Sequence, residues 1–390
     1  MENEHKVKVL TCILAVVIVL SGTFGFLLYK ENQSLENELL NNADLIELES
    51  YVDKNFYKSP DRKVAMDGAL KGYVAGLGDP YSSYLTEDEY KSWQTMESGT
   101  MVGIGVTVQQ HETGLYVVEV TEGYPAYVSG IHKGDIIIEV EGEKVTDIGY
   151  DETVARIKGE EGTEVTISVD RNGERQEFTV MRSEIEMVTA SGKMLDENIG
   201  YIRISAFREN TDEQFAEIFD SLLSEGAKGL IFDVRNNGGG LLTSLQAILD
   251  PLLPEGNIAI ATYGNGDVRT IVQSDAEETN IPMAVLVNGN TASAAELFAA
   301  SLSDWDKAFL VGETTFGKGI MQSTESAAGG AITLTVATYQ TVRGECYHGV
   351  GITPDYEVTP VEDYEPDFQE PDASEDAQLR IAWKNLLKAV

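Results

Sequence analysis

Residues 284–302 predict a strand that turns sharply into a helix. The apolar run AVLV at 284–287 is typical of a buried strand, and the turn-forming residues NGN follow at 288–290. From Thr291 onward, apolar side chains recur at helical spacing. Ser293 therefore lies at the corner, where free N–H groups and the positive end of the helix dipole face developing negative charge. This position suits a nucleophile; the alternative is that Thr291 or Ser293 only caps the helix.

The same strand-to-helix pattern occurs earlier in the chain. GLIFDV at 229–234 predicts a buried strand, RNNGGG at 235–240 is a turn rich in accessible N–H groups, and a helix is expected from Leu241. A turn of this kind can supply oxyanion donors. Because such helices alternate with buried strands, the fold class is predicted to be an α/β core.

A lysine flanked by glycines follows the second helix, in GETTFGKGIMQ at 312–322. Gly317 and Gly319 let another backbone or a substrate approach Lys318 closely. Gln322 comes four residues later, a spacing that places both side chains on one side of either a helix or a strand. We therefore expect Lys318 and Gln322 to act together.

Four segments of the chain resemble the motifs of the carboxyl-terminal processing peptidases, the tail-specific serine proteases with a Ser-Lys dyad. They are DVRNNGGG at 233–240, NTASAAE at 290–296, GETTFGKGIMQ at 312–322 and GVGITPD at 349–355. Four motifs in the right order are far more specific than any one of them. One departure is Gly238, where relatives often carry proline, and it bears on the stiffness of the oxyanion loop.

The resemblance implies a serine endopeptidase and a role for five residues. Ser293 is the expected nucleophile, Lys318 the general base, and Gln322 the residue that orients the lysine. The N–H groups of Gly239 and Ala294 are the expected oxyanion donors. In this mechanism neutral Lys318 takes the proton of Ser293, and the alkoxide attacks the peptide carbonyl.

The identity of the base has one alternative, His348, because Ser-His pairs are the commoner solution. Lys318 can act only when neutral, so its pKa has to fall from the free value of ~10.4. Burial among Phe316, Ile320 and the nucleophile helix is expected to lower that pKa, since desolvation disfavours the ammonium. Gln322 holds the amine without adding a negative charge that would raise the pKa again.

Residues 98–182 form a β-rich stretch that resembles a PDZ domain, with the expected groove helix at 150–157. Gly103, Ile104 and Gly105 resemble the loop whose N–H groups hold a substrate's C-terminal carboxylate while the peptide adds as an extra strand. The alternative for these three residues is a tight β-turn. GDPYSSY at 78–84 resembles the signature that precedes the PDZ domain in this family.

The N-terminal segment predicts a membrane anchor. Residues 9–29 are an uncharged apolar run, long enough to cross ~30 Å of hydrocarbon as a helix. Lys6 and Lys8 precede it, which favours a cytoplasmic stub at 1–8 and an extracytoplasmic body. The expected order continues with a helical region at 30–97, the PDZ domain at 98–182 and the peptidase core at 183–362. An acidic linker at 363–375 and a C-terminal helix at 376–390 complete it.

The composition argues against two classes of function, nucleic-acid binding and metal binding. The formal net charge of −37, from 65 acidic and 28 basic residues, argues against nucleic-acid binding, which needs basic patches. The two cysteines do not decide the compartment. We predict neither a metal nor another cofactor, because the histidines show no metal-ligand spacing. The histidines are His5, His111, His132 and His348.

The sequence thus predicts a single-pass cell-membrane peptidase that recognises accessible substrate C-termini through its PDZ domain. The partners are protein or peptide substrates, and the resemblance together with the terminal helices is compatible with a homodimer. Two other functions stay open. One is a catalytically silent PDZ scaffold, and the other is a ligand-binding module on the same fold.

Overall fold

The computed structural model describes residues 30, 43–275, 277–360, 366, 368 and 370–389. The chain divides into two compact units, Met1–Tyr73 and Val74–Val390. The predicted transmembrane segment, residues 9–29, lies outside the described residues. Within the described residues, none of the helices combines the length and the apolar character needed to span a bilayer.

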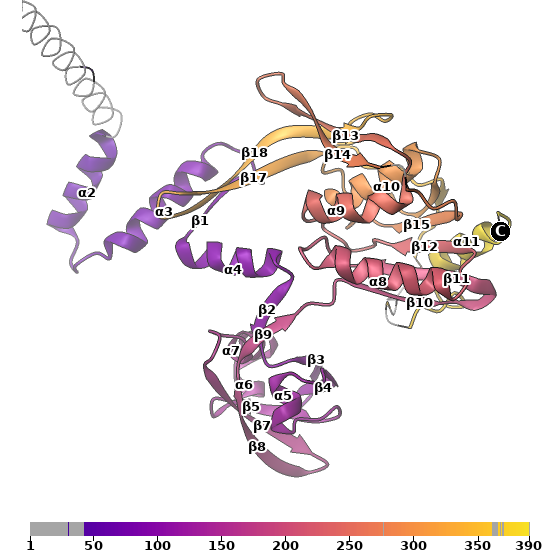
Figure 1. The fold of residues 1–390 in the computed structure, drawn as a ribbon. Helices are drawn as coiled ribbons and strands as arrows, with labels where there is room; N and C mark the ends of the chain where they lie inside the picture. The colour runs from indigo at the N-terminus through magenta and orange to yellow at the C-terminus, as the bar shows by residue number, and fades with distance from the viewer. Residues whose placement is uncertain are drawn as a thin grey trace, which may run out of the picture. The chain divides into compact units, whose positions relative to one another are not determined.

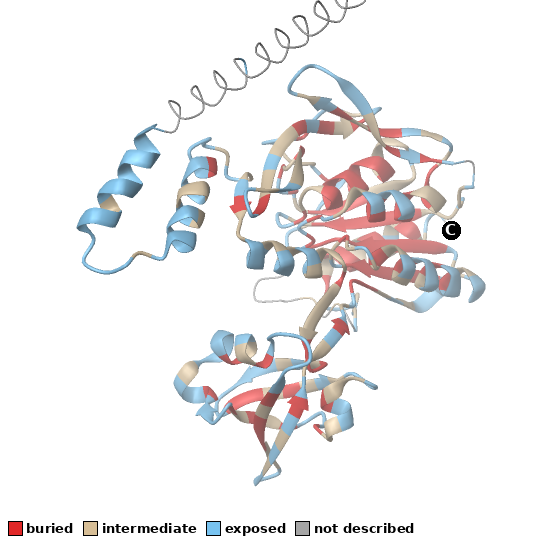
Figure 2. Cartoon of the chain, turned by 60° about the vertical axis from the view of Figure 1, so that its left-hand side comes forward, coloured by how far each residue is buried: buried red, intermediate tan, exposed pale blue. Residues whose placement is uncertain are grey.

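Two helices dominate the described part of the N-terminal region. They are α2 (Ala43–Asn55) and α3 (Arg62–Ala75), and α3 confirms the helix expected near this point. Helix α2 has no buried residues, and Figure 2 accordingly shows mostly pale blue along it. Leu45 and Leu48 of α2 are exposed apolar residues.

The region predicted as a peptidase core is built on a six-stranded sheet in the order β10-β11-β12-β15-β16-β19. β10 pairs antiparallel with β11, and the remaining neighbours are parallel. Every residue of β11, β12 and β15 is buried, as expected of parallel strands covered on both faces. The strands are β10 (Ala190–Met194), β11 (Ile199–Ile204), β12 (Gly229–Asp233), β15 (Met283–Val287), β16 (Ala308–Gly312) and β19 (Tyr356–Glu357).

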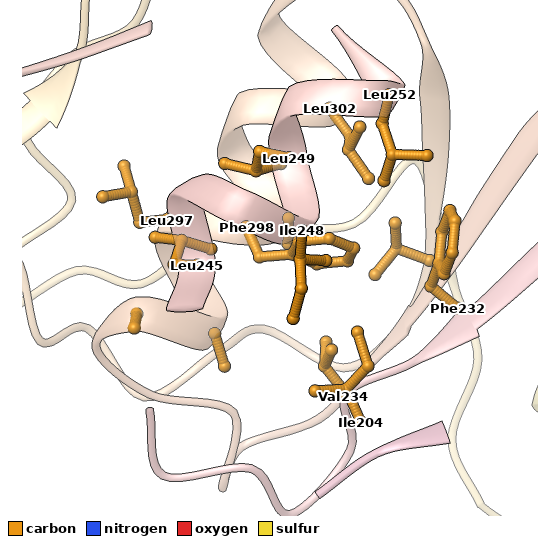
Figure 3. Close-up of a cluster of buried hydrophobic side chains, with 14 of the residues drawn as sticks. Ile204, Phe232, Val234, Leu245, Ile248, Leu249, Leu252, Leu297, Phe298 and Leu302 are labelled. Carbon is orange, nitrogen blue, oxygen red and sulfur yellow. The ribbon is translucent and has the colours of Figure 1, made fainter. Parts of the chain in front are cut away.

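Helices cover both faces of this sheet. Because neighbouring strand residues point to opposite faces, Phe232 belongs to one buried cluster and Ile231 to another. Figure 3 shows Ile248 of α9 and Phe298 of α10 converging beside Phe232 in the first cluster. The second cluster is closed by Leu379, Ala382 and Leu386 of the C-terminal helix. The helices are α8 (Thr211–Ser224), α9 (Leu242–Leu249), α10 (Ala294–Asp304) and α11 (Ala377–Leu386), with short 3-10 turns η1 (Asp196–Asn198) and η2 (Asp250–Leu252).

A second sheet has five strands, which include β13, β14, β17 and β18 in the upper part of Figure 1. Its order is β1-β18-β13-β14, and β17 pairs with β18 as well. Its longest strand is β18, which pairs with β1, β13 and β17. The elements are β1 (Ser83–Leu85), β13 (Gly256–Tyr263), β14 (Val268–Ser274), β17 (Ile320–Ala327) and β18 (Gly330–Thr341), with α4 (Glu87–Glu97) following β1.

The region predicted as a PDZ domain has a sheet and a hydrophobic cluster of its own. Strand β3 lies at the edge of the order β3-β4-β5-β7-β8, so its outer side can accept a further strand. Helix α7 spans Tyr150–Ile157, the range predicted for the groove helix. The antiparallel pair β2 (Thr100–Gly103) and β9 (Ser183–Glu186) flanks the domain in sequence. The other elements are β3 (Val106–His111), β4 (Gly114–Val120), α5 (Pro125–Ser129), β5 (Ile136–Val140), β6 (Glu143–Lys144), α6 (Val145–Ile148), β7 (Glu164–Arg171) and β8 (Glu174–Met181).

Candidate active site

Two loops meet at the carboxyl ends of the neighbouring parallel strands β12 and β15. Their register places Asp233 opposite Leu286, so the chain leaves both strands at the same edge of the sheet. Asn236 then joins the two loops: its N–H donates to Asn288 Oδ1 at 3.0 Å, and its Oδ1 accepts from the side-chain amide of Asn290 at 3.0 Å. The strand topology therefore brings residues 235–240 beside Ser293.

Ser293 occupies the corner between β15 and α10 in a strained backbone conformation. Its φ of 57° and ψ of −124° differ from the extended geometry of an ordinary N-cap. Non-glycine residues hold such angles only where their surroundings impose them, and these positions cluster at functional sites. Gly239 is one such neighbour: a Cβ at Gly239 would lie 2.7 Å from Ser293 Cβ. Ser293 is the N-cap of α10 and forms a capping box with Glu296, as the capping alternative expects. Capping does not require the strained backbone or the close approach of Gly239, and these two features favour a nucleophile.

The two expected oxyanion donors are in different situations. The N–H of Gly239 donates to Asn237 Oδ1 at 2.8 Å, so in this structure it is engaged by a side chain. Asn237 is fully buried, and its amide also donates to Ile204 O at 3.0 Å. The N–H of Ala294 lies in the first turn of α10, where backbone donors have no intrahelical partner. A Cβ at Gly238 would meet no atom within 4 Å, so the absence of a side chain there is not required for space.

Glu296 is a central residue of the site that sequence reasoning did not single out. Its carboxylate is fully buried and accepts hydrogen bonds from Ser293 N (3.0 Å), Thr315 Oγ1 (2.5 Å), Gly317 N (2.7 Å) and Lys318 N (2.7 Å). It therefore ties the nucleophile corner to the lysine loop. The signal was present in the sequence, because Glu296 closes the NTASAAE motif three residues after the serine.

Lys318 lies in the loop before β17, half-buried, with its Nζ 4.9 Å from the centre of the Tyr81 ring. Burial lowers the pKa of the Lys318 ammonium, whereas the carboxylates of Asp79 and Glu296 act in the opposite direction. The lowered pKa predicted for Lys318 is therefore confirmed in direction. One of the residues expected to bury the lysine was wrong. Phe316 is 56% exposed, because the loop turns its side chain outward, so it does not bury the lysine.

Gln322 lies at the bulge in β17 and donates from Nε2 to Thr335 Oγ1 at 3.2 Å. Within the described residues no hydrogen bond joins its side chain directly to Lys318. The N–H of Thr335 donates to Ser82 Oγ at 3.1 Å, and Ser82 Oγ donates to Asp79 Oδ2 at 2.6 Å. Asp79 is one of the carboxylates that act on Lys318. Asp79 and Tyr81 come from the GDPYSSY segment, for which the sequence indicated only a signature and a turn.

One cleft of about 640 Å³ collects most of the predicted catalytic residues. Ser293, Lys318, Gln322 and Gly239 all line it, whereas the rival base His348 is exposed. Other walls are aromatic and apolar, and an Arg208–Glu97 ion pair lies in the cleft. These further lining residues include Tyr81, Trp93, Leu241, Leu242, Ile320, Met321 and Tyr339.

The predicted carboxylate loop lies at the end of the PDZ groove. Gly103 ends β2, Ile104 is buried in the domain core, and Gly105 adopts a φ of 81°. A Cβ at Gly105 would lie 2.4 Å from Tyr124 Cβ, so glycine is required there for space as well as for conformation. The three loop residues line a pocket together with residues of β3 and with Val154 of α7. An extended peptide bound between that strand and that helix would lie in this pocket.

Comparison with protein families agrees with this organisation. A model described as "Peptidase family S41" matches residues 198–358, and a "PDZ domain" model matches residues 102–181. The first match contains the loops of Gly239, Ser293 and Lys318. The second contains the Gly103–Gly105 loop and α7.

Individual relatives carry the likeness over most of the chain. "Carboxy-terminal processing protease CtpA" of Bacillus subtilis (strain 168) is 35% identical over 349 residues, covering 87% of this chain and 74% of that protein. A "Probable CtpA-like serine protease" of Staphylococcus aureus (strain COL) is 32% identical over 308 residues, covering 78% of this chain and 62% of that protein. A Bacteroides fragilis NCTC 9343 structure assigned to the S41 proteases shares the fold, with a TM-score of 0.52 at 17% identity, covering 86% of this chain and 92% of that one.

Proposed function

The chain belongs to the carboxyl-terminal processing peptidases of peptidase family S41, and on that premise we propose that it hydrolyses peptide bonds by a Ser-Lys acyl-enzyme mechanism. The observation that carries this proposal is the joint placement of Ser293 and Lys318 in one cleft, with Glu296 bonded to the backbone of both. The substrates are partly unfolded proteins or proteins with an exposed C-terminal tail.

The chemistry follows from the charges in the cleft. Burial favours the neutral amine of Lys318, which accepts the proton of Ser293 as the hydroxyl oxygen attacks the scissile carbonyl. The N–H of Ala294, and that of Gly239 once it leaves Asn237, stabilise the oxyanion; one such donor is worth ~3 kcal/mol of barrier. The protonated lysine returns its proton to the leaving amine, and water then hydrolyses the acyl-enzyme.

A fluorophosphonate probe tests this function directly. We expect the purified chain to be labelled at Ser293 and to cleave an unfolded protein, and Ser293→Ala to lose both properties. Ser323→Ala, a change of the same chemistry in β17, is the matched control and retains both. A wild-type chain that neither labels nor cleaves would instead support the silent scaffold or the ligand-binding module.

The PDZ domain is proposed to bind the C-terminus of the substrate. The edge strand β3 and the Gly103–Gly105 loop support this role. In the full-length Ser293→Ala chain, a peptide with an apolar last residue and a free carboxylate should bind at least about tenfold more tightly than its C-terminal amide, because the amide loses charge-assisted hydrogen bonds. Equal binding of acid and amide would contradict the assignment.

The chain is further proposed to be anchored in the cell membrane with its body outside the cytoplasm. The support is the apolar run at 9–29 and its basic N-terminal flank. Protease added to spheroplasts should digest everything after about Lys30. Protection of the peptidase region until the membrane is opened would reverse the orientation.

A further inference from the structure

Arg235 is the first residue of the oxyanion loop, residues 235–240, and its guanidinium is buried against the start of the C-terminal helix. Because successive side chains of a strand point to opposite faces of the sheet, Val234 packs in the α9 and α10 cluster whereas Arg235 faces α11. Nη2 of Arg235 pairs with Asp376 Oδ2 at 2.8 Å, and its Nη1 donates to Gln378 Oε1 at 2.9 Å. The oxyanion loop is thus bonded to α11 at its first residue.

The charges around this arginine are balanced. Its Nε and Nη2 also donate to Asp233 Oδ1 and Oδ2, at 3.0 Å and 2.6 Å, and Nη1 of Arg203 donates to Asp233 O at 2.9 Å. Two buried arginines therefore face two buried carboxylates, Asp233 and Asp376. Although burial acts to raise the pKa of Asp233, the Arg235 guanidinium holds that pKa below its usual value. Desolvation offsets much of the attraction in such a cluster, so its fixed geometry is more informative than its stability.

The backbone on either side of the arginine is bonded to the nucleophile corner. Val234 O accepts a hydrogen bond from Thr291 Oγ1 at 2.9 Å, and Asn237 O accepts one from Ala292 N–H at 2.9 Å. Asn237 also engages the N–H of Gly239 through its side chain. The loop is therefore held from two sides, by the nucleophile corner and by the start of α11.

We propose that Asp376 is a positioning residue: through Arg235 it fixes the start of the oxyanion loop, so that the C-terminal helix sets the placement of the Gly239 N–H relative to Ser293. This inference rests on the proposed Ser-Lys mechanism and adds to it a residue of α11, which lies outside the cleft.

Asp376→Asn breaks this link and keeps α11 capped. Asp376 Oδ1 accepts from the N–H groups of Gln378 and Leu379, at 2.9 Å and 3.0 Å, and asparagine is an equally good N-cap. With that oxygen retained, the new amide nitrogen faces Arg235 Nη2, a donor opposite a donor. The fold should survive, because Arg235 keeps its hydrogen bonds to Asp233.

Asp135→Asn is the matched control, in the PDZ domain. Asp135 is 1% exposed, and Asp376 is 4% exposed. Like Asp376, it accepts a backbone N–H, from His132 at 2.8 Å, and pairs with an arginine, Arg171, at 2.7 Å. The two variants therefore make the same chemical change in equivalent surroundings, and only one of them touches the oxyanion loop.

The first measurement is amide hydrogen exchange of the full-length chain, which does not depend on activity. In Asp376→Asn, residues 235–241 should exchange at least about tenfold faster than in the wild type, because the loop opens locally once one of its two attachments is lost. Asp135→Asn should leave these residues at the wild-type rate. An unchanged loop in Asp376→Asn, or the same increase throughout both sheets of the core, would overturn the inference.

Gln378→Met tests the same link without a change of charge, and it decides the matter alone if Asp376→Asn does not fold. It removes the acceptor of Arg235 Nη1 and the hydrogen bond to Val358 O, which lies outside the loop. Methionine is flexible enough to fill the buried position. Exchange of residues 235–241 should again become faster, by less than in Asp376→Asn. A wild-type rate in Gln378→Met would contradict the proposed link.

The second measurement connects the loop to catalysis. Asp376→Asn should be labelled by a fluorophosphonate about tenfold more slowly and lose about tenfold in kcat, with KM within about twofold, because a displaced oxyanion donor acts on the transition state. The pH profile should not change, since Lys318 is untouched, and Asp135→Asn should label at the wild-type rate. Normal labelling and kcat in Asp376→Asn would overturn the positioning role. If the loop exchanges faster but the wild-type chain does not label, the link to α11 stands and the proposed function fails.

Discussion

Lys318→Ala should lose peptide hydrolysis by a factor of about 1000 or more, because the substitution removes the general base of the proposed mechanism. The lysine lies in the same cleft as Ser293, and burial lowers the pKa of its ammonium. The fold should survive, since Lys318 is held by its backbone N–H to Glu296 and alanine keeps that bond. Steady-state kinetics and thermal unfolding of the purified variant measure both parts.

His348→Ala is the control for this prediction. The histidine side chain is exposed, and its removal should leave most of the activity. The opposite pattern, an inactive His348→Ala with an active Lys318→Ala, would show that the chain uses a Ser-His base.

The pH dependence of the wild type provides a second check on the lysine. A base acts when deprotonated, so kcat/KM should rise with pH through the pKa of Lys318 in the free enzyme. Burial lowers that pKa, so the rising limb should lie below the value of ~10.4 for free lysine. The carboxylates of Asp79 and Glu296 limit the downward shift.

Glu296→Gln should inactivate the enzyme by a factor of about 100 or more and destabilise it by about 2–4 kcal/mol. Both carboxylate oxygens accept two hydrogen bonds each, so an amide nitrogen at either position faces an N–H donor. The least costly placement puts the nitrogen beside Thr315, whose hydroxyl can accept, but Gly317 N–H then loses its acceptor. The remaining oxygen still accepts from Ser293 N and Lys318 N, but the amide nitrogen faces the Gly317 N–H and displaces the loop that carries Lys318.

Glu325→Gln, the same change at an exposed position of β17, is the matched control and should keep wild-type activity and stability. Unfolding midpoints and kcat of the two variants decide the outcome. A Glu296→Gln variant with normal kcat would mean that the buried carboxylate does not position the two loops.

Much of the fold follows from local sequence. Strands β12 and β15 are short apolar runs ended by glycine and asparagine, and these features alone indicated buried strands that turn into helices. The groove helix α7 was predicted at its observed bounds from the resemblance of residues 98–182 to a PDZ domain. The pairing of Ser293 with Gly239 was implied by the family resemblance, and the parallel register of β12 and β15 explains why their loops meet at one edge.

The remaining features of the site depend on which distant segments meet. Tyr339 reaches Lys318 because β18 runs beside β13 and β17, and nothing in the residues around Tyr339 shows which of its neighbours is the lysine loop. Tyr81 lies under the lysine although more than 200 residues separate them in the sequence. Pattern analysis assigns a residue to a face of its own element, whereas contacts of this range are set only when the elements pack.

The α/β core, the inserted β-rich domain and a short set of catalytic residues could all be predicted from the sequence. Apolar periodicity, turn chemistry and motif order are properties of neighbouring residues, so they can be recognised without a structure. The packing of distant segments decided that Glu296 also bonds to the loop of Lys318 and that Phe316 faces outward. The physical reason is that hydrogen-bond partners and burial depend on the positions of atoms contributed by several segments, and packing of the two sheets fixes those positions.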